Sequence, residues 1–169
     1  WRSVSHALNC FVAESFMDEL AHAAKKDPFE FRRDLLGKQP RFKRVLEEAA
    51  AMAGWGKAPA GRHQGIALME GYGTYLAQVA EVSVTGGALK VHRVVCAVDC
   101  GQMVNPAIVE SQIESGIVFG LTAALWGEIT LDRGRVRETN FDRYRLMRLN
   151  EAPAIEVRLL ESREAPGGV

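Results

Sequence analysis

The sequence has few cysteines, no excess charge of either sign and no long uncharged apolar run. Its three cysteines cannot form a dense disulfide framework. Cys96 and Cys100 have no second Cys or His pair at zinc-binding spacing, so we expect them to be small buried apolar residues. Lys plus Arg and Asp plus Glu both number 21. Net charge therefore favours neither nucleic acid nor an acidic lipid surface as a partner.

Sequence motifs for several common chemistries are also absent. The uncharged run 115–127 is shorter than the ~18 residues that a membrane span requires. There is no Walker motif and no Ser/His/Asp or Cys/His nucleophile set, and Gly71-Tyr72-Gly73 lacks the third glycine of a dinucleotide loop. We expect a β-bulge or a close backbone approach at those glycines. The arginines between 133 and 148 alternate with acidic residues, which indicates an ion-paired surface and not an RNA site.

The most informative stretch is 98–126, where an apolar strand leads into a long helix. The strand stops at Cys100-Gly101. Asn105 can cap a helix through its side-chain oxygen, and Pro106 suits the first helical position because its missing N–H costs nothing there. One side of this helix carries an apolar stripe at four-residue spacing, made of Val109, Ile113, Ile117 and Leu121.

Gln112 lies on a different side of the same helix, with Gly116 about 40° and Gly120 about 80° further round the axis. Side chains this small let another backbone or a ligand come close. Spacing alone favours a structural explanation, in which the glycines allow tight packing and Gln112 makes a structural hydrogen bond. The alternative is a side that faces a ligand.

The remaining elements predict an α+β fold with a mostly antiparallel sheet, a long central helix and N-terminal helices. Within helix 9–26 the residues Val12, Phe16 and Leu20 form an apolar stripe that we expect to cover the core. Further helices are predicted at 29–36 and 40–54, and strands at 65–70, 72–84, 88–99 and 154–160, with hairpin turns at 85–87 and 132–134. This divides the chain into a helical segment, 1–54, and a sheet with the long helix, 62–169.

The string VDCGQMVNPAIVESQIESGIVFGLTAAL resembles the carboxy-terminal part of the large, molybdenum-cofactor-binding subunit of the xanthine dehydrogenase/aldehyde oxidoreductase family. Within that family it is most similar to the isoquinoline 1-oxidoreductase beta-subunit branch. The resemblance runs from WRSVSHALNCFVAESFMDELAHAAKKDPFEFRRDLL through GIALMEGYGTYLAQVAEVSV to NFDRYRLMRLNEAPAIEVRLLESREAPGGV. Because the chain starts at Trp1 and stops at Gly167-Gly168-Val169, we expect it to be a fragment of a molybdopterin-binding region.

The resemblance implies oxidation of N-heterocycles or aldehydes with oxygen from water. In the family the basic glutamate follows a Gly-Gly-x-Gly sequence, so we expect it just beyond Val169 and expect no catalytic residue or metal ligand within the chain. The implied cofactor-binding residues are Gln112 and Arg2. Val4 is the implied substrate-pocket residue, small where the xanthine oxidase branch has an aromatic. We expect His6 to be a hydrogen-bonding surface residue and not the base.

The implied cofactor of the full-length enzyme is a molybdenum-pterin, either molybdopterin or its cytosine dinucleotide form, with none bound to the fragment. The implied partners are a small 2Fe-2S subunit and a small-molecule substrate, with no nucleic acid and no membrane span. We expect the fragment to be inactive alone and to self-associate through exposed apolar surface. The compartment, bacterial cytoplasm or periplasm, is not encoded. A non-catalytic binding or structural domain sharing the fold is the alternative.

Overall fold

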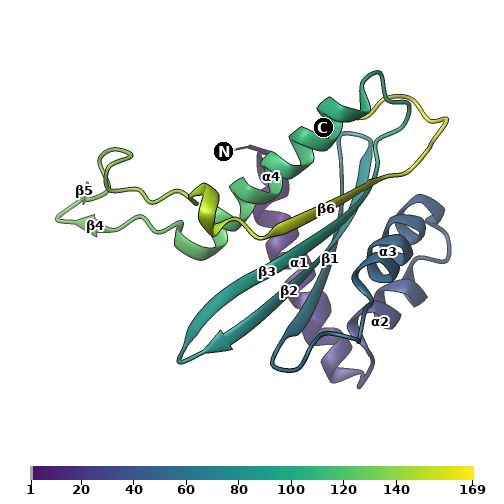
Figure 1. The fold of residues 1–169 in the computed structure, drawn as a ribbon, viewed down its shortest axis with the longest axis horizontal. Helices are drawn as coiled ribbons and strands as arrows, with labels where there is room; N and C mark the ends of the chain where they lie inside the picture. The colour runs from purple at the N-terminus through teal and green to yellow at the C-terminus, as the bar shows by residue number, and fades with distance from the viewer. Residues whose placement is uncertain (1) are drawn as a thin grey trace.

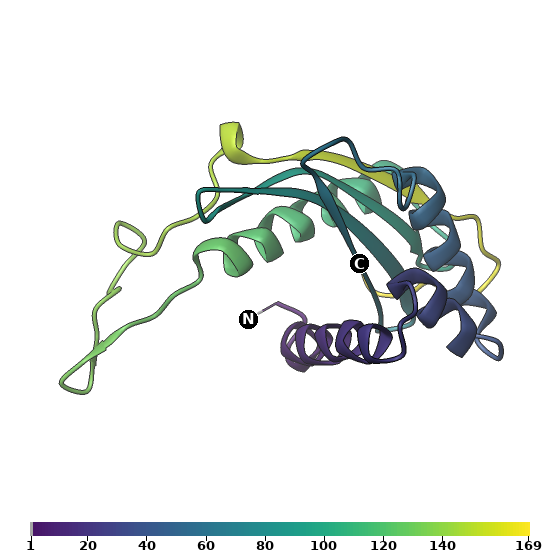
Figure 2. The same cartoon turned by 90° about the horizontal axis from the view of Figure 1, so that it is seen from below.

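A four-stranded sheet of order β1-β2-β3-β6 forms the centre of the protein, with helices on both faces (Figures 1 and 2). The computed structural model describes residues 2–169. The helices are α1 (Ser5–Ala23), α2 (Pro28–Leu35), α3 (Pro40–Ala53) and α4 (Pro106–Trp126). The strands are β1 (His63–Gly71), β2 (Thr74–Thr85), β3 (Ala88–Asp99), β4 (Leu131–Asp132), β5 (Arg135–Val136) and β6 (Ala154–Leu159), with a 3-10 turn, η1 (Leu149–Glu151). The predicted α+β class is confirmed.

Strands β1, β2 and β3 form an antiparallel meander, whereas β6 pairs with β3 in parallel. The sheet is therefore mostly antiparallel, as the hairpin turns predict. Its one irregularity lies between Glu81 and Val82 on β2. A parallel pair needs a crossover connection, and here α4 and the β4–β5 hairpin provide it.

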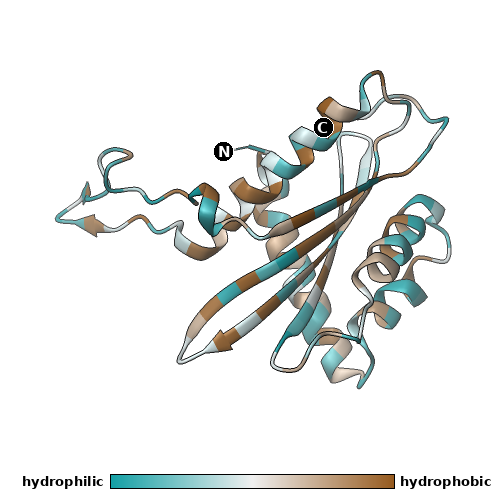
Figure 3. Cartoon of the chain, in the orientation of Figure 1, coloured by the Kyte–Doolittle hydropathy of each residue, from teal (hydrophilic) through white to brown (hydrophobic). Residues whose placement is uncertain are grey.

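Alternate residues of β3 point to opposite faces of the sheet, and each set joins a different core. Val95 and Ala97 pack with α3, together with Val45, Leu46 and Ala49 of that helix. The other set packs with α4 and comprises Val94, Cys96 and Val98. Figure 3 shows the apolar residues concentrated along these central strands.

The N-terminus of α4 is where the sequence predicts it. The Asn105 side chain accepts a hydrogen bond from the Ile108 N–H at 3.3 Å, and Pro106 occupies the first turn. By length and composition alone, α4 could cross a membrane, which differs from the expectation based on its uncharged run. The core helix of a globular protein meets the same criteria, and α4 buries Val109 and Ile117 against the sheet.

Helix α1 differs most from the prediction. It spans Ser5–Ala23 and not 9–26, and its apolar stripe faces solvent: Val12 is 65% exposed and Phe16 56%. The opposite, polar side faces inward, where Glu14 and Asp18 both pair with Arg32, a residue of α2 that is 1% exposed. The expectation that this stripe covers the core is therefore wrong, because a buried arginine selects the charged side of the helix.

The segment between α4 and β6 extends away from the sheet and carries the short β4–β5 hairpin (Figure 1). Arg145 pairs with Glu151 and also lies 4.1 Å from the Trp126 ring centroid. Arg143 lies 3.9 Å from Asp142. These contacts agree with the predicted ion-paired surface.

Candidate functional site

Three segments distant in sequence meet at one end of the sheet: the β1–β2 turn at 72–73, the β3–α4 connection at 100–105, and the C-terminal segment 160–169. Backbone hydrogen bonds join them. The Gly167 N–H donates to the Cys100 carbonyl at 2.8 Å, and the Gly168 N–H donates to the Tyr72 carbonyl at 3.0 Å. The Gln102 N–H donates to the Glu164 carbonyl at 3.0 Å. The C-terminal segment is therefore held against both turns.

Two glycines make this approach possible. A Cβ on Gly101, which has φ +74°, would lie 2.1 Å from the Ala165 carbonyl oxygen. A Cβ on Gly167 would lie 2.4 Å from the Thr74 hydroxyl oxygen. No side chain fits at either position. The close approach expected near Gly73 is present, but these residues form the β1–β2 turn and not a bulge within a strand.

A buried ion pair, Asp99 with Arg41, braces the same three segments. Arg41 donates to both Asp99 carboxylate oxygens, Nε at 2.9 Å and an Nη at 2.8 Å, and to the Gly73 carbonyl at 3.3 Å. Asp99 is 2% exposed and also accepts the Gly101 N–H at 3.1 Å. The Arg41 guanidinium is the main cause that holds the pKa of Asp99 below its usual range; burial opposes it, and Gly101 and Ser162 add hydrogen bonds.

The N-terminal loop joins this assembly through aromatic contacts. The His6 ring lies edge-on to Tyr72, with centroids 5.1 Å apart, so His6 packs against the β1–β2 turn and is more than the surface residue we expected. The Arg2 guanidinium lies 4.7 Å from the Phe119 ring centroid on α4. Val4 stays 70% exposed.

Gln112 lies on an open side of α4. Phe119 follows it by seven residues, two helical turns or about 10 Å along the axis, so Arg2 and Gln112 share one side of the helix. Nothing lies within 4 Å of where a Cβ would stand on Gly116 or Gly120. Among residues 2–169, nothing packs closely on these two glycines, and Gln112 makes no side-chain hydrogen bond. Tight helix packing therefore does not explain these glycines within the described chain.

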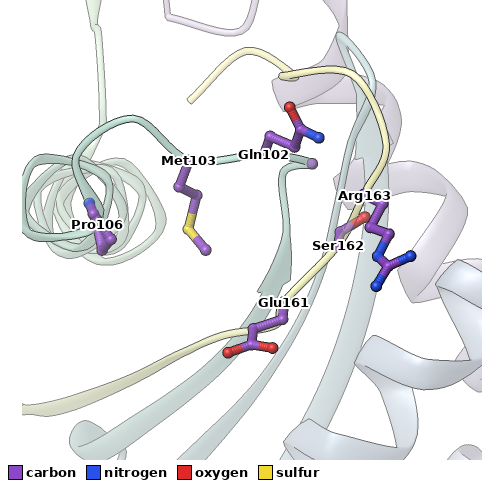
Figure 4. Close-up of a pocket in the computed structure, with 7 residues that line it drawn as sticks. Gln102, Met103, Pro106, Glu161, Ser162 and Arg163 are labelled. Atoms are coloured by element: carbon purple, nitrogen blue, oxygen red, sulfur yellow. The ribbon is translucent and has the colours of Figure 1, made fainter.

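An open hollow of about 450 Å³ lies between the start of α4 and the C-terminal segment (Figure 4). It is lined by Gly101, Gln102, Met103, Pro106, Glu161, Ser162 and Arg163. The predicted cofactor and substrate residues, Gln112, Arg2 and Val4, do not line it. The resemblance pointed to the middle of α4, whereas the hollow lies at the N-terminal end of that helix.

The cysteines behave as the sequence predicts. Cys96 and Cys100 are 0% and 4% exposed, and burial raises the pKa of the Cys96 thiol to about 12 and also raises that of Cys100. Neither is a thiolate near neutral pH. Across the part of the chain that the structure describes, no three His, Cys, Asp or Glu side chains group as a metal site would need.

The structure thus brings Arg2 to the side of α4 that carries Gln112, and brings Val169 to the same end of the sheet as His6 and Tyr72 through the backbone bond of Gly168. Sequence reasoning missed the Asp99–Arg41 brace. One signal was present: Asp99 is an acidic residue at the end of an apolar strand.

Comparison with known proteins identifies the family. A family model described as a molybdopterin cofactor-binding domain matches residues 12–153. The chain belongs to this family. The match includes α4, the whole β1–β2–β3 meander and most of α1.

Relatives of known name extend this assignment. The chain is 36% identical to the isoquinoline 1-oxidoreductase subunit beta of Brevundimonas diminuta, over 99% of this chain and 22% of that protein. It is 30% identical to the membrane-bound aldehyde dehydrogenase [pyrroloquinoline-quinone] of Gluconacetobacter polyoxogenes, over 99% of this chain and 25% of that protein. The chain thus spans about a quarter of the length of these relatives.

A solved structure shares the fold. The crystal structure of quinoline 2-oxidoreductase from Pseudomonas putida 86 superposes with a TM-score of 0.50 and 30% sequence identity. The superposition covers 53% of this chain and 12% of that one. The predicted membership in the molybdenum-cofactor-binding family is therefore confirmed by sequence and by fold.

Proposed function

We propose that this chain is part of the large subunit of a molybdenum hydroxylase and that the glycine-lined side of α4 forms one wall of the site for its molybdenum-pterin. The observation that carries the proposal is the meeting of Arg2 with α4 on the side that presents Gln112. Membership in the molybdopterin cofactor-binding family supports it.

The residues on this wall fit a pterin chemically. A pterin ring has both N–H donors and acceptor atoms at its edge, and the Gln112 amide can donate and accept at once. Gly116 and Gly120 have open space where a Cβ would stand, so a ligand can come close to the helix backbone. The fit is the same for molybdopterin and for its cytosine dinucleotide form, because both share the pterin.

In this proposal the bound cofactor supplies the oxidation of a substrate carbon with oxygen from water. Gln112 binds and orients the pterin, and the Arg2 guanidinium places a positive charge beside it. Val4, exposed on the N-terminal loop, lines the substrate pocket. The general base is a glutamate that follows Val169 in the intact protein, and the bonds made by Gly167 and Gly168 fix the direction from which it enters.

The substrate class proposed is N-heterocycles of the isoquinoline type or aldehydes. Two relatives support these classes, one named for isoquinoline and one for aldehyde oxidation. We further propose a small 2Fe-2S subunit as the electron-accepting partner. The isolated chain is proposed to be inactive, to hold no cofactor, and to self-associate through the exposed stripe on α1, where Val12 is 65% and Phe16 56% exposed.

Replacing Gln112 tests this proposal. In the intact protein, Gln112→Ala should lower both the molybdenum content and the turnover of an N-heterocycle, because the amide that holds the pterin is lost. Glu114→Gln is the matched control: it changes an exposed polar residue on the same helix that lies about 160° away around the axis. Metal analysis after purification and steady-state kinetics measure the two effects.

The same experiment separates the enzyme from the alternative, a non-catalytic binding or structural domain. If the intact protein contains molybdenum and Gln112→Ala alone depletes it, the enzyme proposal holds. If Gln112→Ala and Glu114→Gln both keep full molybdenum content and turnover, Gln112 does not belong to the site. If the unaltered intact protein contains neither molybdenum nor pterin, the binding-domain alternative replaces the proposal.

A further inference from the structure

Two consecutive residues of the N-terminal loop have a backbone conformation that L-amino acids rarely adopt. Ser3 has φ 64° and Val4 has φ 49° with ψ −124°. The second is more unusual because Val4 is β-branched, and such residues are genuine outliers at positive φ. Conformations of this kind persist only where neighbouring groups hold them, and they cluster at ligand-binding sites.

His6 is the residue that holds this loop. Its backbone N–H donates to the Ser3 carbonyl at 2.9 Å, which closes the turn that contains Val4. Its ring lies 3.7 Å from the position that a Cβ on Gly71 would take. The same ring meets Tyr72 edge-on at 5.1 Å between centroids and 67° between planes. The N-terminal loop is therefore attached to the β1–β2 turn through one imidazole.

Tyr72 also contacts the C-terminal segment, through its backbone carbonyl and its Cβ. Its carbonyl accepts the Gly168 N–H at 3.0 Å, and its Cβ lies 3.0 Å from the position of a Cβ on Gly168. Tyr72 itself has φ 54°, so it is a third non-glycine residue with positive φ in this region. One residue thus touches both the loop that carries Val4 and the segment that ends in Gly168 and Val169.

We propose that the His6–Tyr72 pair is a positioning device that sets the separation between the Arg2–Val4 loop and the Gly167–Gly168 segment, and so determines which substrates fit between them. This inference rests on the proposed function, in which Val4 lines the substrate pocket and the base follows Val169. Neither ring needs to touch the substrate. The pair acts through the two segments that it joins, and a planar bicyclic N-heterocycle depends on their separation more than a short aldehyde does.

The test uses His6→Ala, Tyr72→Ala and the double variant in the intact protein. Hydrogen exchange of peptides covering residues 2–6 and 161–169 reports on the two segments directly. Tyr72→Ala keeps the carbonyl that Gly168 binds but removes the ring that holds the β1–β2 turn against His6. Because the C-terminal segment is held through that turn, exchange should speed in both peptides, and the double variant should add little to it. For a bicyclic N-heterocycle KM should rise about 2- to 10-fold, the range expected for loss of an aromatic pair, while KM for a short aldehyde and the molybdenum content stay unchanged.

Two controls separate positioning from general destabilisation. Tyr72→Phe keeps the ring that meets His6, so it should show the exchange pattern and KM of the unaltered protein. Phe141→Ala removes an aromatic ring that is 76% exposed on the segment between α4 and β6, and it should change neither.

The proposal is overturned if Tyr72→Ala speeds exchange in only one of the two peptides, or if KM rises equally for both substrates with a loss of molybdenum. If the unaltered protein shows no molybdenum and no turnover, the proposed function fails. The exchange data then still decide whether His6 and Tyr72 couple the two segments.

Discussion

The two faces of the central sheet are completed to different degrees. On one face, α3 buries Val45, Leu46 and Ala49 completely against the strands. On the other face, α4 buries only Val109, Ile117 and Thr122, and its glycine-lined side remains open. The first face has the burial of a finished core and stabilises the fold. The second face leaves part of α4 uncovered by the described chain, as the proposed cofactor wall requires.

Helices α1 and α3 repeat this contrast. Helix α3 turns its apolar side to the sheet, whereas α1 turns the Val12–Phe16 stripe outward and its acidic residues toward the buried Arg32. Apolar stripes of this kind mark interaction surfaces when they are exposed. Three measurements test whether the two regions differ in this way.

Truncating an apolar side chain to alanine should change the free energy of unfolding much more on α3 than on α1. The Leu46 side chain on α3 is 0% exposed, so Leu46→Ala leaves a cavity in the core. This substitution should lower the free energy of unfolding by about 2–5 kcal/mol. Phe16→Ala on α1 removes a ring that is 56% exposed and should change it by less than about 0.5 kcal/mol. Urea denaturation of the purified chain measures both. A loss of similar size for both variants would mean that the α1 stripe is covered in solution.

The Asp99–Arg41 brace should make a pH-dependent contribution to the free energy of unfolding. The pKa of Asp99 is lowered in the fold, so its stabilisation is present above the ordinary aspartate pKa of about 4 and is lost as the pH falls through the lowered value. Asp99→Asn should lower the unfolding free energy by about 2 kcal/mol at neutral pH, because the charged hydrogen bonds to Arg41 are lost. The difference from the unaltered chain should shrink in acid.

A more exposed pair serves as the control for this measurement. Glu156 pairs with Arg93 and its side chain is 48% exposed, so Glu156→Gln should cost less than about 1 kcal/mol. Thermal or urea unfolding followed from pH 7 to pH 3 compares the two variants. An equal loss for Asp99→Asn and Glu156→Gln would contradict the role of Asp99 as a buried brace.

The smallest effect concerns the glycine-lined side of α4. Gly116→Ala should raise the stability of the chain by about 0.5–1 kcal/mol, because alanine favours the helix and nothing lies within 4 Å of the new methyl group. In the intact protein the same methyl group should lower cofactor content if this side receives the pterin. Higher chain stability together with lower cofactor content would support the binding wall. Higher stability with no loss of cofactor would show that this side of α4 is free in the intact protein.

Local chemistry allowed part of this fold to be predicted. Asn105 and Pro106 fixed the start of α4 because capping depends on neighbours in sequence, and the glycines at 86–87 fixed the β2–β3 hairpin for the same reason. The hydrophobic period of α1 located a helix but not the side that faces the core. That choice depends on Arg32, which lies on another helix.

The candidate site was less accessible to sequence reasoning because long-range contacts build it. Arg41 and Asp99 are 58 positions apart, and no spacing rule connects them. His6, Tyr72 and Gly168 come from the start, middle and end of the chain. The family resemblance directed attention to Arg2 and Gln112, and the structure places them on one side of α4; their roles toward the cofactor stay predictions.

The parallel pairing of β6 with β3 also affects how the chain folds during its synthesis. During synthesis β3 leaves the ribosome more than fifty residues before β6. Until β6 is made, the valine-rich outer edge of β3 has no strand with which to form hydrogen bonds. Pairing across such a separation is slow compared with closing the β2–β3 hairpin. Helix α4 is translated in that interval and packs on the face of β3 that carries Val94, Cys96 and Val98, so this face can be covered before β6 completes the edge.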